Sequence, residues 1–159
     1  MLFTSTYELA IDAKNRLSMP ASIRSKMDPD VDGTGFYLVT GEWPNTLNLY
    51  PEKYFHAFAQ QQHASLDPGE ETDMYETVFY GRATELELDK QGRVVLPQWM
   101  LSLAGIGKKV ALSGSRDHLV LWDREAHRRF MDANGSRSKD LLRLAQMQTK
   151  IYRQNGGHV

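Results

Sequence analysis

The sequence has no cysteine in its 159 residues and no long apolar run. The first absence excludes disulfide bonds within the chain, zinc sites built from thiolates and cysteine nucleophiles. The second excludes a membrane-spanning helix, which needs about 20 consecutive apolar residues. Residues 1–7 have neither a basic start nor an adequate apolar run, so we expect no signal peptide and a soluble, intracellular protein.

An excess of charge of one sign is also missing, because the formal net charge is −1. Many DNA-binding domains are strongly basic, so this sum argues weakly against a nucleic-acid partner. The distribution is uneven, however. Residues 1–80 hold 5 Lys and Arg against 12 Asp and Glu, a net charge of −7, and residues 81–159 hold 14 against 8, a net charge of +6. Two interpretations stay open: two solvated faces of opposite sign, or acidic and basic surfaces that meet between subunits.

The chain does contain enough apolar material for a packed interior. Apolar residues make up 41% of the sequence and aromatic residues 10%, which argues against global disorder. The length suits one ordinary domain, or two small ones that share a core.

The most informative feature is an internal repeat. The segment from Asp12 to Pro20 aligns with the segment from Asp89 to Pro97, and Asp, Arg and Pro coincide in spacing. Three further matches occur in the same order along the chain: Glu8-Leu9-Ala10-Ile11 with Glu85-Leu86-Glu87-Leu88, Leu38-Val39-Thr40-Gly41 with Ala111-Leu112-Ser113-Gly114, and residues 47–52 with residues 119–124. Four ordered matches are not expected by chance, so we interpret the chain as one module written twice.

Each copy opens with a short alternating strand, a tight turn and a second strand. The predicted strands are residues 7–12 and 16–19 in the first copy, and residues 85–89 and 93–96 in the second. Asn15 and Gly92 stand just before the arginine, where a three-residue hairpin loop often requires positive φ. Pro20 and Pro97 then begin short helices, since a first helical residue needs no N–H. Their predicted core-facing residues are Ile23 and Met27 in one copy, and Met100 with Leu101 or Leu103 in the other.

A second hairpin and further helices complete each copy. The predicted hairpins pair residues 37–40 with 47–50 and residues 110–113 with 119–122, and the predicted helices cover residues 51–62, a segment ending near residue 80, residues 124–134 and residues 139–153. The last helix is amphipathic, with Leu141, Leu144, Ala145 and Ile151 along one face. We expect residues 156–158 to be frayed.

At the two Asp-x-x-x-Arg turns the sequence resembles the MraZ family, whose modules are of the AbrB-like, swapped-hairpin kind. The resemblance covers nearly the whole chain. It implies an α+β fold in which a duplicated AbrB-like module forms a double-split β-barrel-like core with peripheral helices. It further implies SpoVT-AbrB-type modules at residues 5–51 and 81–124, with C-terminal helices and a frayed tail at residues 125–159.

The resemblance also implies a function. It indicates a bacterial transcriptional regulator at the promoter of the division and cell-wall gene cluster, which includes its own gene. The expected partners are short direct repeats in double-stranded DNA and further copies of the chain in a ring-shaped homo-oligomer. The expected location is the cytoplasm, in association with the nucleoid. No membrane, small-molecule substrate, metal or cofactor is implied.

The family's Asp-x-Lys-Gly-Arg pattern carries over to the first turn as Asp12, Lys14 and Arg16. Asn15 stands where the family commonly has glycine. Arginine offers a forked set of donors for guanine or phosphate, and lysine supplies positive charge to phosphate. We therefore expect Lys14 and Arg16 to contact DNA.

In the second turn the pattern carries over as Asp89, Gly92 and Arg93, while the basic residue falls one place early, at Lys90. Gln91 occupies the usual lysine position. We expect Lys90 and Arg93 to contact DNA as well. The residues expected to support the two turns and the short helices after them are Asp12, Asn15, Asp89, Gly92, Pro20 and Pro97.

The physics of a hairpin tip favours the same role, because two-stranded ribbons fit the DNA major groove. One tip gives little affinity, but many tips in one oligomer multiply weak contacts through effective concentration. A simpler interpretation also stays open, in which each Asp–Arg pair is only a salt bridge that closes its turn.

Two rival functions remain beside the DNA-binding regulator. The first is a protein–protein scaffold or antitoxin-like module of the same fold that does not read bases. The second is an enzyme, which we do not expect, since no nucleophile–base pair or cofactor loop emerges from the sequence. The five histidines also lack the spacing of metal ligands.

Overall fold

The computed structural model describes residues 1–154, and their side chains through residue 149. The expected fraying of residues 156–158 and the orientation of the Ile151 side chain lie outside the described residues. The chain divides into two units, residues 1–124 and the part that begins at Glu125.

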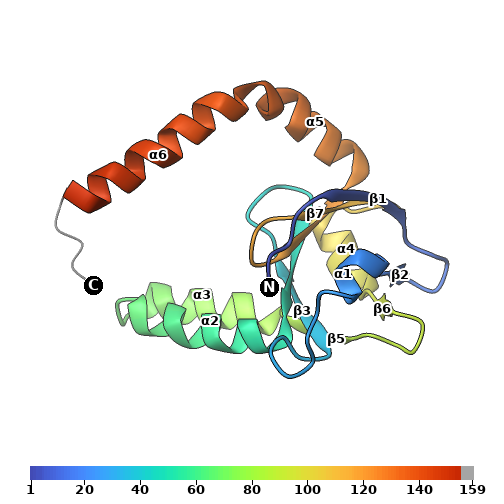
Figure 1. Cartoon of the computed structure of the whole chain (residues 1–159). Coiled ribbons are helices and arrows are strands. Elements are labelled where there is room, and N and C mark those ends of the chain that lie inside the picture. The colour runs from blue at the N-terminus through green and yellow to red at the C-terminus, as the bar shows by residue number, and fades with distance from the viewer. Residues whose placement is uncertain (155–159) are drawn as a thin grey trace. The chain divides into compact units, whose positions relative to one another are not determined.

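Eight strands and six α-helices lie within the described residues (Figure 1). The strands are β1 (Thr6–Ala10), β2 (Arg16–Ser18), β3 (Gly35–Thr40), β4 (Thr46–Pro51), β5 (Thr84–Glu87), β6 (Arg93–Val95), β7 (Lys109–Gly114) and β8 (Leu119–Asp123). The helices are α1 (Ala21–Arg24), α2 (Glu52–Ser65), α3 (Glu70–Gly81), α4 (Gln98–Ala104), α5 (Arg124–Asn134) and α6 (Ser138–Gln154). A 3₁₀ turn, η1 (Gly135–Arg137), joins α5 to α6. The presence of both helices and strands confirms the α+β class.

The strands form a six-stranded sheet in the order β1-β7-β8-β4-β3-β5 and a separate two-stranded sheet of β2 and β6. All pairs are antiparallel. The predicted strands and the longer predicted helices are all present, with ends that differ by no more than about three residues, the usual uncertainty of element ends.

The expected pairing within the opening hairpins is wrong. β1 pairs with β7 instead of β2, and β5 pairs with β3 instead of β6. The two strands of each opening segment diverge from the turn, and each strand pairs with a strand of the other copy. Pairing across the copies gives every short strand a neighbour and places Leu17, Leu86 and Val94 in one shared core.

The β2–β6 pairing is nearly symmetric about one residue pair, Leu17 opposite Val94. On one side of this pair the Met19 N–H donates to the Gly92 carbonyl at 2.9 Å. On the other side the Leu96 N–H donates to the Asn15 carbonyl at 2.8 Å. These residues are equivalent in the two copies, so the repeat in the sequence becomes a local twofold relation in the structure.

The sequence alignment of the second hairpins is shifted by one residue. Leu38 lies opposite Leu49 in β3–β4, and Leu112 lies opposite Leu121 in β7–β8. Leu38 therefore corresponds to Leu112 and not to Ala111. The reason is that the loop between β3 and β4 is longer than the loop between β7 and β8. The alignment by sequence placed this difference in length at another point in the chain.

The large sheet is buried on both faces around β3. Phe36 and Leu38 point into the main core, which collects buried residues from both copies, while Val39 joins a smaller cluster with Tyr50 and Phe55 under α2. This alternation follows from the period-2 geometry of a strand. The main core contains the expected Ile23, Met100 and Leu101, with Met27 packed at its edge. Leu103 is exposed, so Leu101 is the core residue of that pair.

Pro20 and Pro97 precede α1 and α4 as N-cap residues, and the expectation that they are the first helical residues is wrong by one position. Their backbone is extended, with ψ of 138° and 125°. Each proline carbonyl nevertheless accepts the first helical N–H bonds, which is the role of an N-cap.

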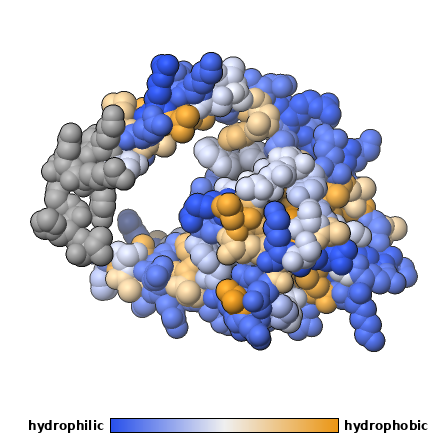
Figure 2. All heavy atoms as spheres, viewed as in Figure 1, coloured by the Kyte–Doolittle hydropathy of each residue, from blue (hydrophilic) through white to orange (hydrophobic). Residues whose placement is uncertain are grey.

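Hydrophobic residues also remain on the surface, in separate patches among hydrophilic ones on the face shown in Figure 2. Trp43 and Trp99 are half-exposed, whereas Trp122 is buried. In the second unit, α6 forms as expected and its described side chains are all exposed, Leu141, Leu144 and Ala145 among them. No helix in the described part of the chain is both long and apolar enough to cross a membrane.

Candidate nucleic-acid interface

The first turn is built around the side chain of Asp12. Its Oδ1 accepts the backbone N–H of Lys14 at 2.9 Å and that of Arg16 at 2.9 Å. The Asn15 N–H donates to the Asp12 carbonyl at 3.0 Å, and Asn15 has a φ of +59°. Asparagine tolerates this left-handed conformation, as the sequence predicts. A short acidic side chain that accepts N–H groups a few residues further on is a typical way to close a turn.

The second turn repeats this geometry. The Asp89 Oδ1 accepts the N–H of Gln91 at 2.8 Å and that of Arg93 at 2.9 Å. Gly92 has a φ of +76° and donates its N–H to the Asp89 carbonyl at 3.0 Å. The predicted positive φ is thus confirmed in both turns, and the two Asp-x-x-x-Arg segments share one local structure.

Each aspartate also holds the arginine that ends its turn. The Arg16 Nε donates to Asp12 Oδ2 at 2.6 Å, and the Arg93 Nε donates to Asp89 Oδ2 at 2.9 Å. A carboxylate that binds Nε fixes the plane of the guanidinium, whose fork of donors is rigid. Each pair is therefore a salt bridge that also orients its arginine.

The backbone hydrogen bonds keep both aspartates charged. The N–H of Arg16 is the largest influence that lowers the pKa of Asp12 below its usual value of 3.8, and the N–H of Arg93 does the same for the pKa of Asp89. Smaller contributions to both pKa shifts come from the guanidinium and from the second backbone N–H. Both carboxylates remain acceptors at neutral pH.

The β2–β6 ribbon presents both arginines on one face. Arg16 lies opposite Val95, and Ser18 lies opposite Arg93. Side chains of paired residues share a face, as do those two positions apart, so these four residues line the solvent side while Leu17 points into the core. The arginines lie two residue positions apart along the ribbon, about 7 Å at the usual rise.

The arginines are less exposed than expected for hairpin tips. The side chains of Arg16 and Arg93 are 29% and 26% exposed, because each one lies back against its aspartate. Lys14 and Lys90 are exposed at the turns themselves. Both turns lie on the side of the first unit that carries β2 and β6 (Figure 1). The site thus combines two oriented guanidiniums on the ribbon with two exposed ammonium groups at its ends.

Two further cations, which the sequence pattern did not indicate, lie at the turns. The Lys108 Nζ donates to the Asn15 Oδ1, and the Arg24 Nε donates to the Met19 carbonyl at 3.0 Å. Arg24 packs so closely over Gly92 that a Cβ there would lie 2.5 Å from its Nε. The Lys108-Lys109 pair was visible in the sequence, but its position beside the opposite turn follows only from the exchange of strands.

This arrangement suits recognition of an anionic, planar or phosphate-bearing partner. Forked guanidinium donors match phosphate or the guanine edge, and exposed lysines add charge that acts at a distance. Among the described residues, no three His, Asp or Glu side chains are grouped so as to hold a metal ion.

Comparison with known proteins agrees with the doubled turn. The sequence matches the family model described as "MraZ protein, putative antitoxin-like" over residues 2–76 and 79–147. It is similar to the "Transcriptional regulator MraZ" of Mesoplasma florum, with 28% identity over 141 residues that make up 89% of this chain and 93% of the relative. The proteins of the same name from Finegoldia magna and Clostridium tetani are 29% and 27% identical, over 88% and 84% of this chain and 94% and 89% of their own lengths. Both Asp-x-x-x-Arg turns lie inside the matched segments, and the chain belongs to the MraZ family.

Proposed function

We propose that the chain is a DNA-binding transcriptional regulator that contacts DNA through the solvent face of the β2–β6 ribbon and its two turns. The observation that carries the proposal is the pair of arginines on this face, Arg16 and Arg93, each oriented by an aspartate at 2.6 and 2.9 Å. A two-stranded ribbon fits the major groove. In this proposal the arginines contact base edges or phosphates, while Lys14 and Lys90 contact phosphates.

The fold type forms part of the proposal. We assign the two copies, residues 5–51 and 81–124, to the AbrB-like swapped-hairpin type, with a double-split barrel-like core and residues 125–159 as a C-terminal helical extension. The exchange of strands between the copies supports this assignment, because β1 and β5 each pair with a strand of the other copy.

The family supports a more specific target. We propose that the protein acts at the promoter of the division and cell-wall gene cluster, including its own gene, and binds short direct repeats there. The name of the relatives, Transcriptional regulator MraZ, agrees with the transcriptional part of this proposal. A regulator of this kind works in the cytoplasm in association with the nucleoid.

We also propose that several copies assemble into a ring-shaped homo-oligomer. A single ribbon carries only a few cations and the chain is nearly neutral overall, so one copy offers limited affinity. Several ribbons on one assembly would engage successive direct repeats, and effective concentration would raise the overall affinity.

The proposal is tested with a labelled promoter fragment from upstream of the chain's own gene. Wild-type protein should retard this fragment more strongly than a scrambled fragment, and log affinity should fall steeply with log salt. Replacing Arg16 and Arg93 by Ala should remove about 1–3 kcal/mol of discrimination per base contact. A wild type that binds both fragments equally would contradict base-specific recognition.

Conservative variants separate the effect of the arginines' positive charge on DNA binding from the effect of the guanidinium geometry. Arg16→Lys and Arg93→Lys keep the positive charge but lose the fork, so they should retain non-specific binding and lose preference for the promoter. Arg128→Ala removes an exposed arginine of α5 and should leave the preference intact. Circular dichroism of each variant checks that the turns, which the Asp–Arg pairs help to close, still fold.

A protein–protein scaffold or antitoxin-like role is the second candidate, and the words "antitoxin-like" in the family description agree with its antitoxin-like form. This role uses the same fold without base reading. It predicts no preference for the promoter fragment and capture of a protein partner by the same ribbon, which Arg16→Ala and Arg93→Ala would abolish.

A further inference from the structure

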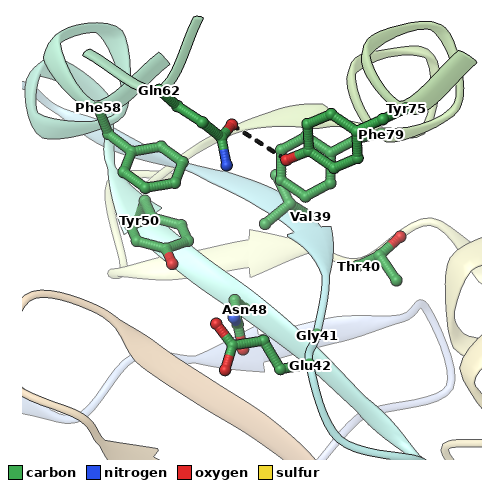
Figure 3. A pocket seen from close by; sticks show the side chains of 10 residues that line it. All are labelled: Val39, Thr40, Gly41, Glu42, Asn48, Tyr50, Phe58, Gln62, Tyr75 and Phe79. Carbon is green, nitrogen blue, oxygen red and sulfur yellow. Dashed lines mark hydrogen bonds between the residues drawn. The ribbon is translucent and has the colours of Figure 1, made fainter. Parts of the chain in front are cut away.

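A recess opens on the face of the large sheet that packs against α2 and α3 (Figure 3). Its volume is about 250 Å³. Two aromatic walls flank it: Tyr50 and Phe58 lie on one side, and Tyr75 and Phe79 lie on the other. This face is opposite to the one that contributes Phe36 and Leu38 to the main core, so the recess is separate from the β2–β6 ribbon.

Both walls are held by contacts of their own. The Tyr50 ring stacks on Phe58 at a centroid distance of 5.3 Å and on His118 at 4.6 Å. Tyr75 stacks on Phe79 at 5.4 Å, and its hydroxyl donates to the Gln62 Oε1 at 3.0 Å. Rings fixed in advance lose little conformational entropy when a ligand enters, which favours binding.

The polar groups of the recess face a ligand from two directions. The Gln62 Oε1 accepts the hydroxyls of Tyr75 and Tyr80, and its amide nitrogen points into the recess (Figure 3). Asn48 is buried, and the carboxylate of Glu42 also lines the recess (Figure 3). Among the described residues that line the recess, Glu42 is the one with a formal charge.

The electrostatics of the site favour a cation. Aromatic faces carry negative potential, and a cation within about 6 Å of a ring centroid gains about 0.5 to 2 kcal/mol per ring. The helices around the recess and the loop between them are acidic as well, since residues 52–81 contain six Asp and Glu against one Lys. Arg82 lines the adjoining groove along α3, outside the recess. Burial, helped by the nearby carboxylates, raises the pKa of Tyr50 to about 12, so this wall stays a neutral phenol.

We propose that this recess binds a small organic cation of the alkylammonium class, with its alkyl groups between the aromatic walls and its charge beside Glu42. The inference does not depend on DNA binding, because it uses another face of the sheet. It gives the protein a second binding site, for a small molecule.

Choline and its neutral isostere 3,3-dimethylbutan-1-ol provide the test, because they differ in charge and hardly in shape. The full-length protein is titrated with each probe and followed by NMR. Choline should shift the amide signals of Gly41 and Asn48 saturably, and its methyl protons should move upfield in the ring currents of the walls. Choline should bind about 2- to 30-fold more tightly than the alcohol, the ratio that corresponds to one cation–π contact.

Two carboxylate variants decide whether the charge effect is local. Glu42→Gln should lower the affinity for choline and leave the affinity for the alcohol unchanged, while the part of the preference that the aromatic walls give to choline remains. Glu71→Gln removes an exposed carboxylate of α3 outside the recess and should change neither. Equal binding of the two probes by the wild type, no saturable choline shift, or an equal effect of both variants would overturn the proposal.

Discussion

Asp12 and Asp89 each hold the backbone of a turn and the side chain of an arginine at the same time. One oxygen accepts two backbone N–H groups and the other accepts an arginine Nε. The same residue types at the same spacing produced this structure twice, in sequence surroundings that differ. The aspartate therefore links the stability of the turn to the orientation of the arginine.

This linkage predicts a dependence of stability on pH. The folded-state pKa of Asp12 and that of Asp89 are lowered, mainly by the backbone N–H of Arg16 and of Arg93. A lowered pKa contributes stability above the unfolded-state value, and this contribution is lost as pH falls through the folded-state value. Between neutral pH and pH of about 3, the double variant Asp12→Asn, Asp89→Asn should lose less stability than the wild type.

Urea denaturation at a series of pH values measures this difference. The charge-matched control is Glu70→Gln, Glu71→Gln, which removes two exposed carboxylates of α3 and should keep the wild-type slope. Parallel pH profiles for the wild type and the aspartate variant would show that the two aspartates do not stabilise the turns.

Gly92 and Asn15 occupy equivalent left-handed positions but differ in their surroundings. A Cβ at position 92 would meet the side chain of Arg24 at 2.5 Å, and a β-branched residue is strained at a φ of +76°. Gly92→Val should therefore destabilise the fold by about 1–3 kcal/mol. Asn15→Gly keeps the conformation and loses only an exposed contact with Lys108, so it should cost less than about 1 kcal/mol.

Thermal unfolding of the two variants, followed by circular dichroism, compares these effects directly. Gly92→Ala serves as the control, because it introduces a Cβ without β-branching and should lie between the other two. Unchanged melting of Gly92→Val would mean that the turn does not need its left-handed residue.

At the scale of elements, the positions of the strands and the pairing within the second hairpins, β3 with β4 and β7 with β8, were predictable, whereas the partners of β1, β2, β5 and β6 were not. Alternation of apolar residues locates a strand, because it depends on which side chains face a core. Pairing depends on which backbone lies alongside, and neighbours in sequence usually pair. In this chain β1 and β2 are neighbours in sequence, yet each pairs with a strand of the other copy. No pattern within a short stretch of sequence indicates that strands pair with the other copy.

The candidate site also has some features that were predictable from the sequence and others that were not. The Asp-x-x-x-Arg spacing predicted the turns and the Asp–Arg contacts, because these interactions span four residues. It did not predict that Arg16 and Arg93 share one face of a ribbon, or that Lys108 reaches the turn at Asn15. Those relations join residues 77 and 93 positions apart, and they follow from topology.

The two faces of the ribbon should respond differently to truncation. Leu17 is fully buried in the core, whereas Val95 is 60% exposed beside the arginines. Leu17→Ala should destabilise the protein by about 2–5 kcal/mol, the usual result for a buried leucine. Val95→Ala should change stability by no more than about 0.5 kcal/mol.

Chemical denaturation measures both effects, and the promoter assay adds a second comparison. A Val95→Ala variant of wild-type stability that loses promoter preference would place the apolar contact of the ribbon at the DNA. Equal destabilisation by the two substitutions would contradict the assignment of an inner and an outer face to this sheet.

At the scale of the whole molecule, the repeat gives the chain two similar halves of opposite charge, −7 in residues 1–80 and +6 in residues 81–159. Similar but non-identical halves allow the second half of one copy to contact the first half of the next. Such a head-to-tail contact closes into a ring when the rotation per subunit divides a full turn. Opposite charge favours this contact over that between two first halves, mainly through specificity and association rate.

We therefore expect a closed homo-oligomer whose affinity comes mostly from apolar contacts. The described surface supplies such groups in both halves, including Met74 and Val78 on α3 and Leu142 and Leu144 on α6, each at least half exposed. Size exclusion with light scattering should report one defined mass well above 18.2 kDa.

Raising the salt should slow association more than it weakens the final assembly, because screening removes the charge steering and leaves the apolar contacts. The charge-reversal variant Glu70→Lys, Asp73→Lys should slow assembly, whereas Asp28→Lys, in the loop after α1, serves as a control of smaller charge change. A monomer at micromolar concentration and moderate salt would contradict the ring, and with it the explanation proposed for tight DNA binding by a nearly neutral chain.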